Sequence, residues 1–354
     1  MTCIVITGMG ASTPVGRTVW ASAAAVRAGI SGFAEHPFMI DTAGGPMRVA
    51  RAPWIADEEA KNGRISHLLL PALEEALRPL DAVPWQGGRL RLSLELGLPP
   101  ERPGLPPDFS NELDESIAAR FSERFFAGET FSIGHAAGLF ALESALRKLS
   151  LGEEDASLVA GADSYLFPET LEWLEECDQL HGAGPLNNAW GFVPGEGAGA
   201  LLLMGEERAR SLGLPVYGRV LGVGTGREKN LIKTESVCIG EGLTTAFRGA
   251  LSLLPPGTKV DALFSDMNGE PYRADEFGFT ALRTKEYFEA AGDYAAPADC
   301  WGDVGAASGP LCSALAIISH YKGYGKGPLS LVWAGSESGE RAAALLLARE
   351  KGDT

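Results

Sequence analysis

The sequence has 354 residues, of which 45% are hydrophobic, so the chain can bury a large core in one large domain or two medium ones. Its formal charge is −16, from 30 basic and 46 acidic residues. This charge disfavours binding to nucleic acids and anionic membranes, and it weakens the case for an acidic carrier protein as the main partner.

The cysteines and the N-terminus indicate an intracellular protein. The five cysteines are odd in number and have no CxxC spacing, which fits a reducing cytosol better than disulfides or a zinc site. The N-terminus lacks a basic stretch followed by a long apolar one, and no run approaches about 18 apolar residues. We therefore expect a cytoplasmic protein without membrane insertion. The histidines are dispersed, so we predict neither a metal nor a cofactor.

The first hundred residues show strand and helix patterns separated by turns. The patterns predict a strand over 3–7, a helix over 19–28, an irregular segment over 30–62, an amphipathic helix over 65–80 and a strand over 90–98. A Pro-rich loop then leads into an acidic stretch, which predicts a helix over 111–126.

The next stretch predicts a tight turn that opens a helix. Small residues cluster from Gly134 to Gly138, and the leucines of the run Leu139–Leu149 recur at helical spacing. His135 is therefore presented at a helix N-terminus, where a nucleophile elbow would display its reactive group. An imidazole stands where such an elbow usually shows a thiol or a hydroxyl.

The rest of the chain continues this alternation of strands and helices. Strands are predicted over 157–163, 216–226, 259–266, 329–333 and 342–348, and helices over 171–180, 244–254 and 275–291. The segment 190–204 contains glycines and then an apolar strand. A small-residue turn from Trp301 to Ser308 opens an apolar helix. The glycines of 222–226 favour a strand-end turn over a dinucleotide loop, because the third glycine spacing and the acidic partner are missing. The alternation predicts an α/β fold with buried sheets.

Five segments, in order along the chain, resemble the β-ketoacyl synthases of the thiolase superfamily. They are CIVITGMGASTPVG, RISHLLLPALEEAL, GHAAGLFALESALRKLSLGEEDASLVAGADSY, GFVPGEGAGALLLMGEERARSLG and DVGAASGP. The resemblance implies a thiolase-like αβαβα five-layer sandwich with two mixed five-stranded sheets, made of two similar halves, 1–210 and 211–354. It also implies a dimer in which the strand near Ser157–Ala162 pairs across the two-fold axis.

The resemblance also implies that the positions of the family's active site are all substituted. Condensing enzymes of this family use a cysteine and two histidines. The alignment puts His135 at the cysteine, Asn268 and Asp303 at the two histidines, and Glu337 at the gating phenylalanine. The lysine that usually precedes the second histidine has no counterpart, and the loop over 98–131 is shorter than the family's. We therefore expect no condensation through a thioester.

The substituted site allows three interpretations. The favoured one is a structural network, in which the helix dipole holds His135 neutral and its ring hydrogen-bonds Asp303 and Asn268. In the second, Asp303 orients His135 as a general base, and Glu337 adds a carboxylate that favours a cationic or neutral ligand. The third moves the nucleophile to Cys300, although a buried structural thiol is the favoured role of that residue.

These interpretations lead to two functional hypotheses. The first is a non-catalytic scaffold, accessory subunit or chaperone, similar to chain-length-factor subunits, which resemble ketosynthases, lack the cysteine and pair with an active partner. It implies a bacterial homodimer, or a heterodimer with a related subunit, and a protein partner that the sequence does not identify. The second is an acyltransferase, hydrolase or decarboxylase that acts on an acyl-thioester ligand through His135 and Asp303.

Overall fold

The computed structural model describes residues 3–55, 60–83, 90–121, 124–231, 234 and 236–350. Within these residues, ten strands form one mixed sheet and two more form a separate hairpin. The strands are β1 (Ile4–Ser12), β2 (Phe33–Ile40), β3 (Pro46–Ala50), β4 (Leu92–Leu98), β5 (Phe125–Ser132), β6 (Ala156–Ser164), β7 (Glu196–Gly205), β8 (Gly218–Arg227), β9 (Ala262–Ser265), β10 (Tyr294–Ala295), β11 (Leu329–Gly335) and β12 (Glu340–Ala348).

Helices flank this sheet. They are α1 (Val19–Arg27), α2 (Ala60–Asp81), α3 (Phe109–Phe121), α4 (Ala137–Leu151), α5 (Pro168–Glu176), α6 (Glu206–Ser211), α7 (Glu241–Leu251), α8 (Pro271–Arg283), α9 (Ala298–Trp301) and α10 (Ser308–Tyr321). Among the described residues, no helix is long and apolar enough to cross a membrane.

The sheet consists of two parts with the same topology. The spatial order is β5-β4-β6-β7-β1 in the first part and β8-β12-β11-β9-β10 in the second. Read from its outer edge (β5 or β10) to the junction (β1 or β8), each part follows the chain order third, second, fourth, fifth, first, with matching parallel and antiparallel neighbours. Only two residue pairs, Val5 with Arg219 and Ile6 with Gly218, join the parts. The two expected sheets are therefore one continuous sheet with a narrow junction.

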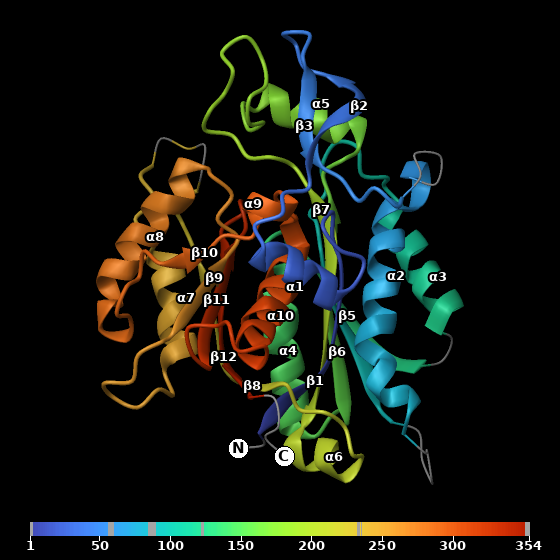
Figure 1. The fold of residues 1–354 in the computed structure, drawn as a ribbon, viewed down its shortest axis with the longest axis vertical. Helices are drawn as coiled ribbons and strands as arrows, with labels where there is room; N and C mark the ends of the chain where they lie inside the picture. Colours follow the sequence, from blue (N-terminus) through green and yellow to red (C-terminus); the bar gives the residue numbers. More distant parts are fainter. Residues whose placement is uncertain are drawn as a thin grey trace.

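The helices and the sheet alternate in five layers, as Figure 1 shows. Helices α4 and α10 lie between the two parts of the sheet, where Leu142 and Leu311 share one apolar cluster with strands of both parts. Helix α2 covers the outer face of the first part, and α7 and α8 cover that of the second. The predicted αβαβα sandwich is confirmed, whereas the division at residues 210 and 211 stays a prediction.

Two expectations about the first part are wrong. The segment 30–62 is not irregular, because it contains the hairpin of β2 and β3, whose Met47 and Val49 pack into an apolar cluster with α5. The helix expected over 111–126 ends at Phe121, and Phe125 begins β5. Strand β5 lies at the edge of the sheet with mostly exposed side chains, so its apolar pattern is weak.

The expected dimer pairing through Ser157–Ala162 is also wrong. That segment lies in β6, which is hydrogen-bonded to β4 on one side and to β7 on the other. Both of its edges are therefore occupied. Within the described chain, the strand with a free edge in this part of the sheet is β5, which pairs only with β4.

Candidate functional site

The candidate site lies where the carboxyl ends of parallel strands meet. Strands β4, β5 and β6 run parallel in the first part of the sheet, and β9 and β11 run parallel in the second. His135 follows β5, Asn268 follows β9 and Glu337 follows β11. Loops at the carboxyl ends of such strands are the usual place for ligands in α/β folds.

A tight turn positions His135 beside Asp303. Gly134 has φ +81°, a left-handed conformation that favours glycine, and it turns the chain from β5 into α4. The His135 side chain is buried, and its Nε2 atom lies 2.8 and 2.9 Å from the two carboxylate oxygens of Asp303. Backbone hydrogen bonds of Asp303 to Val193 and Gly195 hold the carboxylate in place.

The Asp303 carboxylate accepts two further hydrogen bonds. Asn268 Nδ2 donates to Oδ2 at 2.6 Å, and the Gly305 backbone N–H donates to Oδ1 at 2.8 Å. Burial alone would raise the pKa of Asp303, but the neighbouring His135 and Arg273 lower it well below its usual value. Asp303 is therefore ionised at neutral pH. The structure thus brings together three of the four predicted residues, His135, Asn268 and Asp303.

The protonation of His135 differs from the sequence-based expectation. Burial is the largest single influence and lowers the pKa of the imidazole, but the charge and the hydrogen bond of Asp303, together with the charge of Asp266, raise the pKa above its usual value. The imidazole is therefore favoured in its charged form, not held neutral as expected. The contact with a carboxylate at 2.8 Å is a stronger influence than the dipole of a helix that begins two residues later.

Arg273 belongs to the same network, and sequence reasoning missed it. It is buried in the first turn of α8, donates to Asp266 Oδ2 at 2.7 Å and to the Gly335 carbonyl at 3.0 Å, and lies 3.2 Å from His135 Nε2. Arg273 has only N–H donors, and Asp303 is ionised, so we assign the His135 Nε2 proton to the bond with Asp303. No local sequence pattern distinguishes a buried arginine of this kind from one on a helix surface.

Glu337 joins the network indirectly. Gln179 Nε2 donates to Glu337 Oε1 at 2.7 Å and to Glu270 Oε1 at 3.1 Å. Glu270 in turn accepts from Asn268 Nδ2 at 3.0 Å, which links this carboxylate to the group around Asp303. Two buried atoms of this region, Gln179 Oε1 and Tyr272 Oη, have no hydrogen-bond partner among the described residues.

The cysteines near the site are not poised as nucleophiles. Cys300 and Cys312 are both buried, and burial raises the pKa of each thiol, with further contributions from Asp299 and Asp266 respectively. The nucleophilic form of cysteine is the thiolate, which a raised pKa disfavours. The hypothesis of a nucleophile that migrated to Cys300 therefore gains no support.

A hydroxyl group occupies the start of the helix that follows His135. Ser336 Oγ accepts a hydrogen bond of 3.0 Å from the backbone N–H of Ala136. Ser336 lies directly after β11, on the opposite part of the sheet. The Ala136 N–H is thus already satisfied by the protein.

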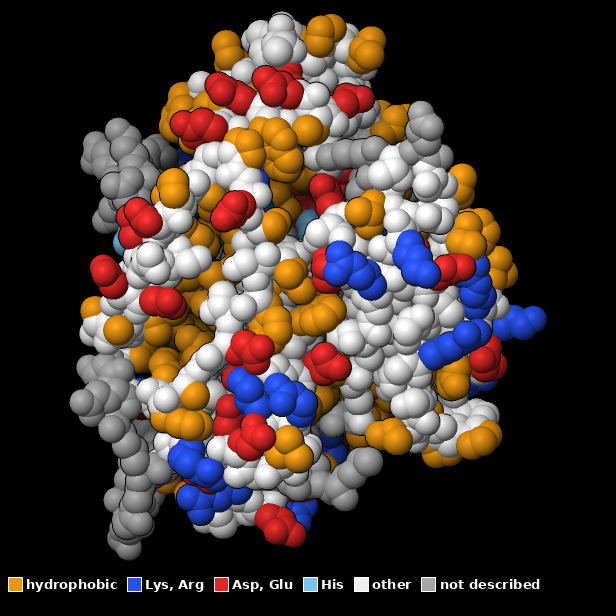
Figure 2. All heavy atoms as spheres, turned by 180° about the vertical axis from the view of Figure 1, so that it is seen from behind, with side chains coloured by type: hydrophobic (Ala, Val, Ile, Leu, Met, Phe, Trp, Pro, Cys, Tyr) orange, Lys and Arg blue, Asp and Glu red, His pale blue; other side chains and the backbone are white. Residues whose placement is uncertain are grey.

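One face of the molecule is hollowed. The cap, which we define as β2, β3, α5 and residues 177–192, stands above the sheet in Figure 1. Figure 2 shows a hollow between the cap and the main body, in which a histidine and acidic side chains are visible.

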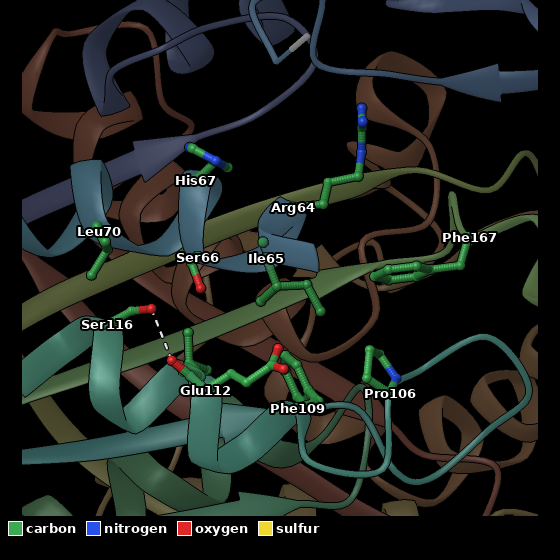
Figure 3. A pocket seen from close by; sticks show the side chains of 12 residues that line it. Arg64, Ile65, Ser66, His67, Leu70, Pro106, Phe109, Glu112, Ser116 and Phe167 are labelled. Carbon is green, nitrogen blue, oxygen red and sulfur yellow. Dashed lines mark hydrogen bonds between the residues drawn. The ribbon is translucent and has the colours of Figure 1, made fainter. Parts of the chain in front are cut away.

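A separate cavity of about 230 Å³ lies between α2 and α3 (Figure 3). Its wall is mostly apolar and includes Ile65, Leu70 and Phe109. The guanidinium of Arg64 points away from it and pairs with buried Glu196. None of the residues around Asp303 lines this cavity, so it is not part of the candidate site.

Comparisons with known proteins identify relatives of one kind. Residues 107–209 match the family described as Beta-ketoacyl synthase, N-terminal domain. The chain is 39% identical over 80 residues to polyketide synthase PksL of Bacillus subtilis (strain 168), and the match covers 22% of the chain and 2% of that protein. It is 32% identical over 122 residues to a Streptomyces cyaneus protein whose name assigns it to the polyketide beta-ketoacyl synthases, covering 31% of the chain and 29% of that protein. These matches span less than a third of either relative.

Solved structures match over nearly the whole chain. One is from a type II polyketide synthase acyl-carrier protein in complex with its ketosynthase bound to the hexaketide, with a TM-score of 0.81, 17% identity and coverage of 99% of this chain and 100% of that one. Another is the ishigamide ketosynthase/chain length factor, with a TM-score of 0.73, 22% identity and coverage of 98% and 99%. A Bacillus subtilis 168 ketosynthase, from module 6 of the bacillaene synthase, has a TM-score of 0.74, 16% identity and coverage of 98% and 72%. The chain therefore has the ketosynthase (thiolase-like) fold, and its residues 107–209 are similar to the N-terminal domain of β-ketoacyl synthases.

Proposed function

We propose that this protein is a ketosynthase-like scaffold or accessory subunit that does not condense acyl chains. In this proposal His135 replaces the family's cysteine, Asn268 and Asp303 replace its two histidines, and Glu337 lies at the gate. The observation that carries the proposal is the buried ion pair between His135 and Asp303 at the start of α4. A condensing enzyme would need a thiolate at this place to accept the acyl chain.

The backbone around His135 supports the proposal. Stabilising the oxyanion of a tetrahedral intermediate requires N–H groups that are free to donate to it. At the start of α4, the Ala136 N–H already donates to Ser336 Oγ at 3.0 Å. Binding an oxyanion there would therefore require the serine hydroxyl to move away.

The charge around the site also argues against a malonyl substrate. Glu270 and Glu337 accept hydrogen bonds from the same amide of Gln179, and Glu270 is buried. Arg273 pairs with Glu270 at 3.4 Å, so these acidic groups would weaken, and not prevent, the binding of a substrate that carries its own carboxylate.

The proposed role requires a partner. The comparison with a ketosynthase/chain length factor structure, whose name describes a pair of related subunits, supports either a homodimer or a heterodimer with a related chain. The free edge of β5 is available for such pairing among the described strands. The proposal includes a bacterial, cytoplasmic setting and a division of the chain at residues 210 and 211. The bacterial relatives support the first of these points.

The proposal is tested by restoring the cysteine. We expect the wild-type protein to form no covalent adduct with an acyl thioester, measured by intact-mass spectrometry. His135→Cys should produce no ketoacyl product from acyl and malonyl thioesters, because an amide and a carboxylate cannot replace the two histidines. Robust ketoacyl product from this single variant would overturn the proposal that the function of the family's two histidines has been lost. Circular dichroism on both proteins verifies that the variant is folded.

A second candidate function has one observation in its favour. No described residue hydrogen-bonds His135 Nδ1, while Asp303 holds Nε2, so the imidazole is oriented with one nitrogen available. This arrangement fits a general acid or base. Because Asp303 raises the pKa of His135, the ring would enter a reaction as an acid. Such a protein would be an acyltransferase, hydrolase or decarboxylase acting on an acyl thioester.

A further inference from the structure

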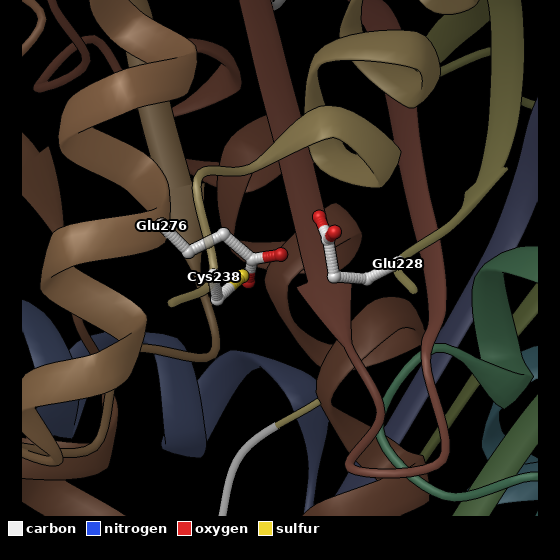
Figure 4. A group of neighbouring side chains, drawn as sticks. All are labelled: Glu228, Cys238 and Glu276. Carbon is white, nitrogen blue, oxygen red and sulfur yellow. The ribbon is translucent and has the colours of Figure 1, made fainter. Parts of the chain in front are cut away.

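Three side chains that bind metals in other proteins converge in the second part of the chain, away from His135. Glu228 follows β8, Cys238 lies in the segment that leads to α7, and Glu276 lies in α8. One carboxylate oxygen of each glutamate and the Cys238 Sγ atom all lie within 4.8 Å of one another. Figure 4 shows the carboxylate of Glu276 beside the thiol, with Glu228 facing them from the adjacent segment.

Other groups of the protein provide only some of the hydrogen bonds and counter-charges that these side chains can accept. Glu276 is 4% exposed, and Arg341 Nε donates to its Oε1 at 2.7 Å. Among the described residues, none donates a hydrogen bond to the second oxygen, Oε2. The Glu228 carboxylate is 2% exposed and accepts only from backbone N–H groups, of Lys229 at 3.2 Å and Gly242 at 3.0 Å. Within the described chain, Glu228 has no cationic partner.

The charges leave a buried excess of negative charge. Among the described residues, Arg341 pairs with Glu276 and Arg273 acts on it from farther away, whereas no cation pairs with Glu228. Burial raises the pKa of Glu276, and Glu228 raises it further. Burial and then Glu276 raise the pKa of the Cys238 thiol to about 12. Buried carboxylates of this kind are normally paired with a cation or bound to a metal.

We propose that Glu228, Cys238 and Glu276 bind one divalent cation of the zinc type. Zinc accepts a cysteine thiolate at about 2.3 Å and carboxylate oxygens at about 2.0–2.2 Å, and three protein ligands leave a fourth position for water. Calcium and magnesium prefer sites made of oxygen atoms alone, so the sulfur favours zinc over them. Binding replaces the thiol proton, which is released to solvent, and the cation then compensates the excess charge.

The cation would have a structural role in this arrangement. It would join the end of β8, the segment before α7 and the helix α8, which packing around Leu243 and Phe277 and hydrogen bonds such as that of Thr280 Oγ1 to the Gly240 carbonyl already link. Glu276 lies about one turn after Arg273 on α8. A cation bound to Glu276 would therefore fix the helix that also carries Arg273. This structural role does not depend on catalytic activity of the protein.

Cobalt serves as the spectroscopic probe of this site. The full-length protein is stripped with a chelator and titrated with Co²⁺, which shows a thiolate-to-metal charge-transfer absorption when a cysteine is bound. We expect one equivalent to bind with this absorption, Zn²⁺ to displace it, and bound metal to raise the Tm. Absence of the charge-transfer band from the folded wild-type protein would overturn the proposal.

Matched variants identify the ligands. Cys238→Ser should abolish the charge-transfer band and weaken Co²⁺ binding at least tenfold, whereas Cys177→Ser, which alters another partly buried free cysteine, should change neither. Glu228→Gln should keep the thiol but also weaken binding at least tenfold. Circular dichroism verifies that each variant is folded, and Glu228→Gln provides a second test if Cys238→Ser is not. A band that persists in Cys238→Ser, or is lost in Cys177→Ser, would place the metal elsewhere and contradict the assignment.

Discussion

Replacing Asp303 by asparagine removes one negative charge from the network while keeping the size of the side chain. Asp303 is 3% exposed and is the direct counter-ion of buried His135. Breaking a buried pair by removing one partner typically costs about 3–5 kcal/mol, because the other charge is left uncompensated. The asparagine can still accept from Gly305, and it leaves no cavity. We therefore expect Asp303→Asn to lower the free energy of unfolding by about 3–5 kcal/mol near pH 6.

Urea unfolding followed by tryptophan fluorescence measures this loss. Asp155→Asn is the matched control, because Asp155 pairs with Arg91 on the surface, where such a pair contributes about 0–1 kcal/mol. Repeating the measurement from pH 5.5 to 9 also tests whether stability rises or falls with pH. Because the pKa of His135 is raised in the folded protein, its stabilisation is complete below about 6.5 and is lost as the pH rises through the folded pKa.

The variant should show the opposite trend. Without Asp303, burial and Arg273 both disfavour the charged imidazole, so the pKa of His135 should fall below its usual value. Stability of the variant should then rise with pH through the region near 6.5, where that of the wild type begins to fall. The lowered pKa of Asp303 itself contributes no slope in this range, because its stabilisation is lost only in acid, below about 3.9. A loss equal to that of the control, or parallel pH profiles, would refute this reasoning.

Three further outcomes are expected. An NMR titration of the wild-type protein should give His135 a pKa above about 6.5, and a lower value would contradict the dominance of the carboxylate. Gly305→Ala should destabilise the protein more than Gly29→Ala in thermal unfolding. Both glycines have positive φ, a conformation that costs alanine about 1–2 kcal/mol. A methyl group at position 305 would also overlap the Asp163 carboxylate, whereas the space around position 29 is open. Equal losses of stability in the two variants would show that Asp163 moves away from the added methyl group. Ser336→Ala should cost about 1 kcal/mol in urea unfolding by leaving a helix-start N–H without its acceptor, and an unchanged midpoint would argue against that bond.

Helices and strands with a strong pattern of hydrophobic residues could be predicted from the sequence. The leucines of α4 and the apolar runs of β11 and β12 were placed within a few residues, and these two strands pair with each other in the sheet. Strand β5 could not be distinguished from the end of the preceding helix. Its side chains are mostly exposed, and its pairing with β4 depends on residues distant in the chain. The hairpin of β2 and β3 was missed because prolines and glycines interrupt it.

The candidate site was predictable where a sequence pattern marked the position. His135, Asn268 and Asp303 were predicted to lie together because of the resemblance, and the structure places them in contact. Arg273 and Gln179 were missed, because a long polar side chain can reach a buried group from any nearby element. The charge state of His135 was also wrongly predicted, since the strength of a carboxylate contact depends on a distance that the sequence does not contain.

We propose that the protein does not turn over acyl thioesters. The most direct measurement is incubation of the purified protein with labelled acyl and malonyl thioesters, with wild type and His135→Ala compared side by side. We predict that neither protein produces condensed, hydrolysed or decarboxylated product above the rate without protein. Turnover by the wild type that disappears in His135→Ala would contradict the scaffold proposal and establish the acid–base function of His135.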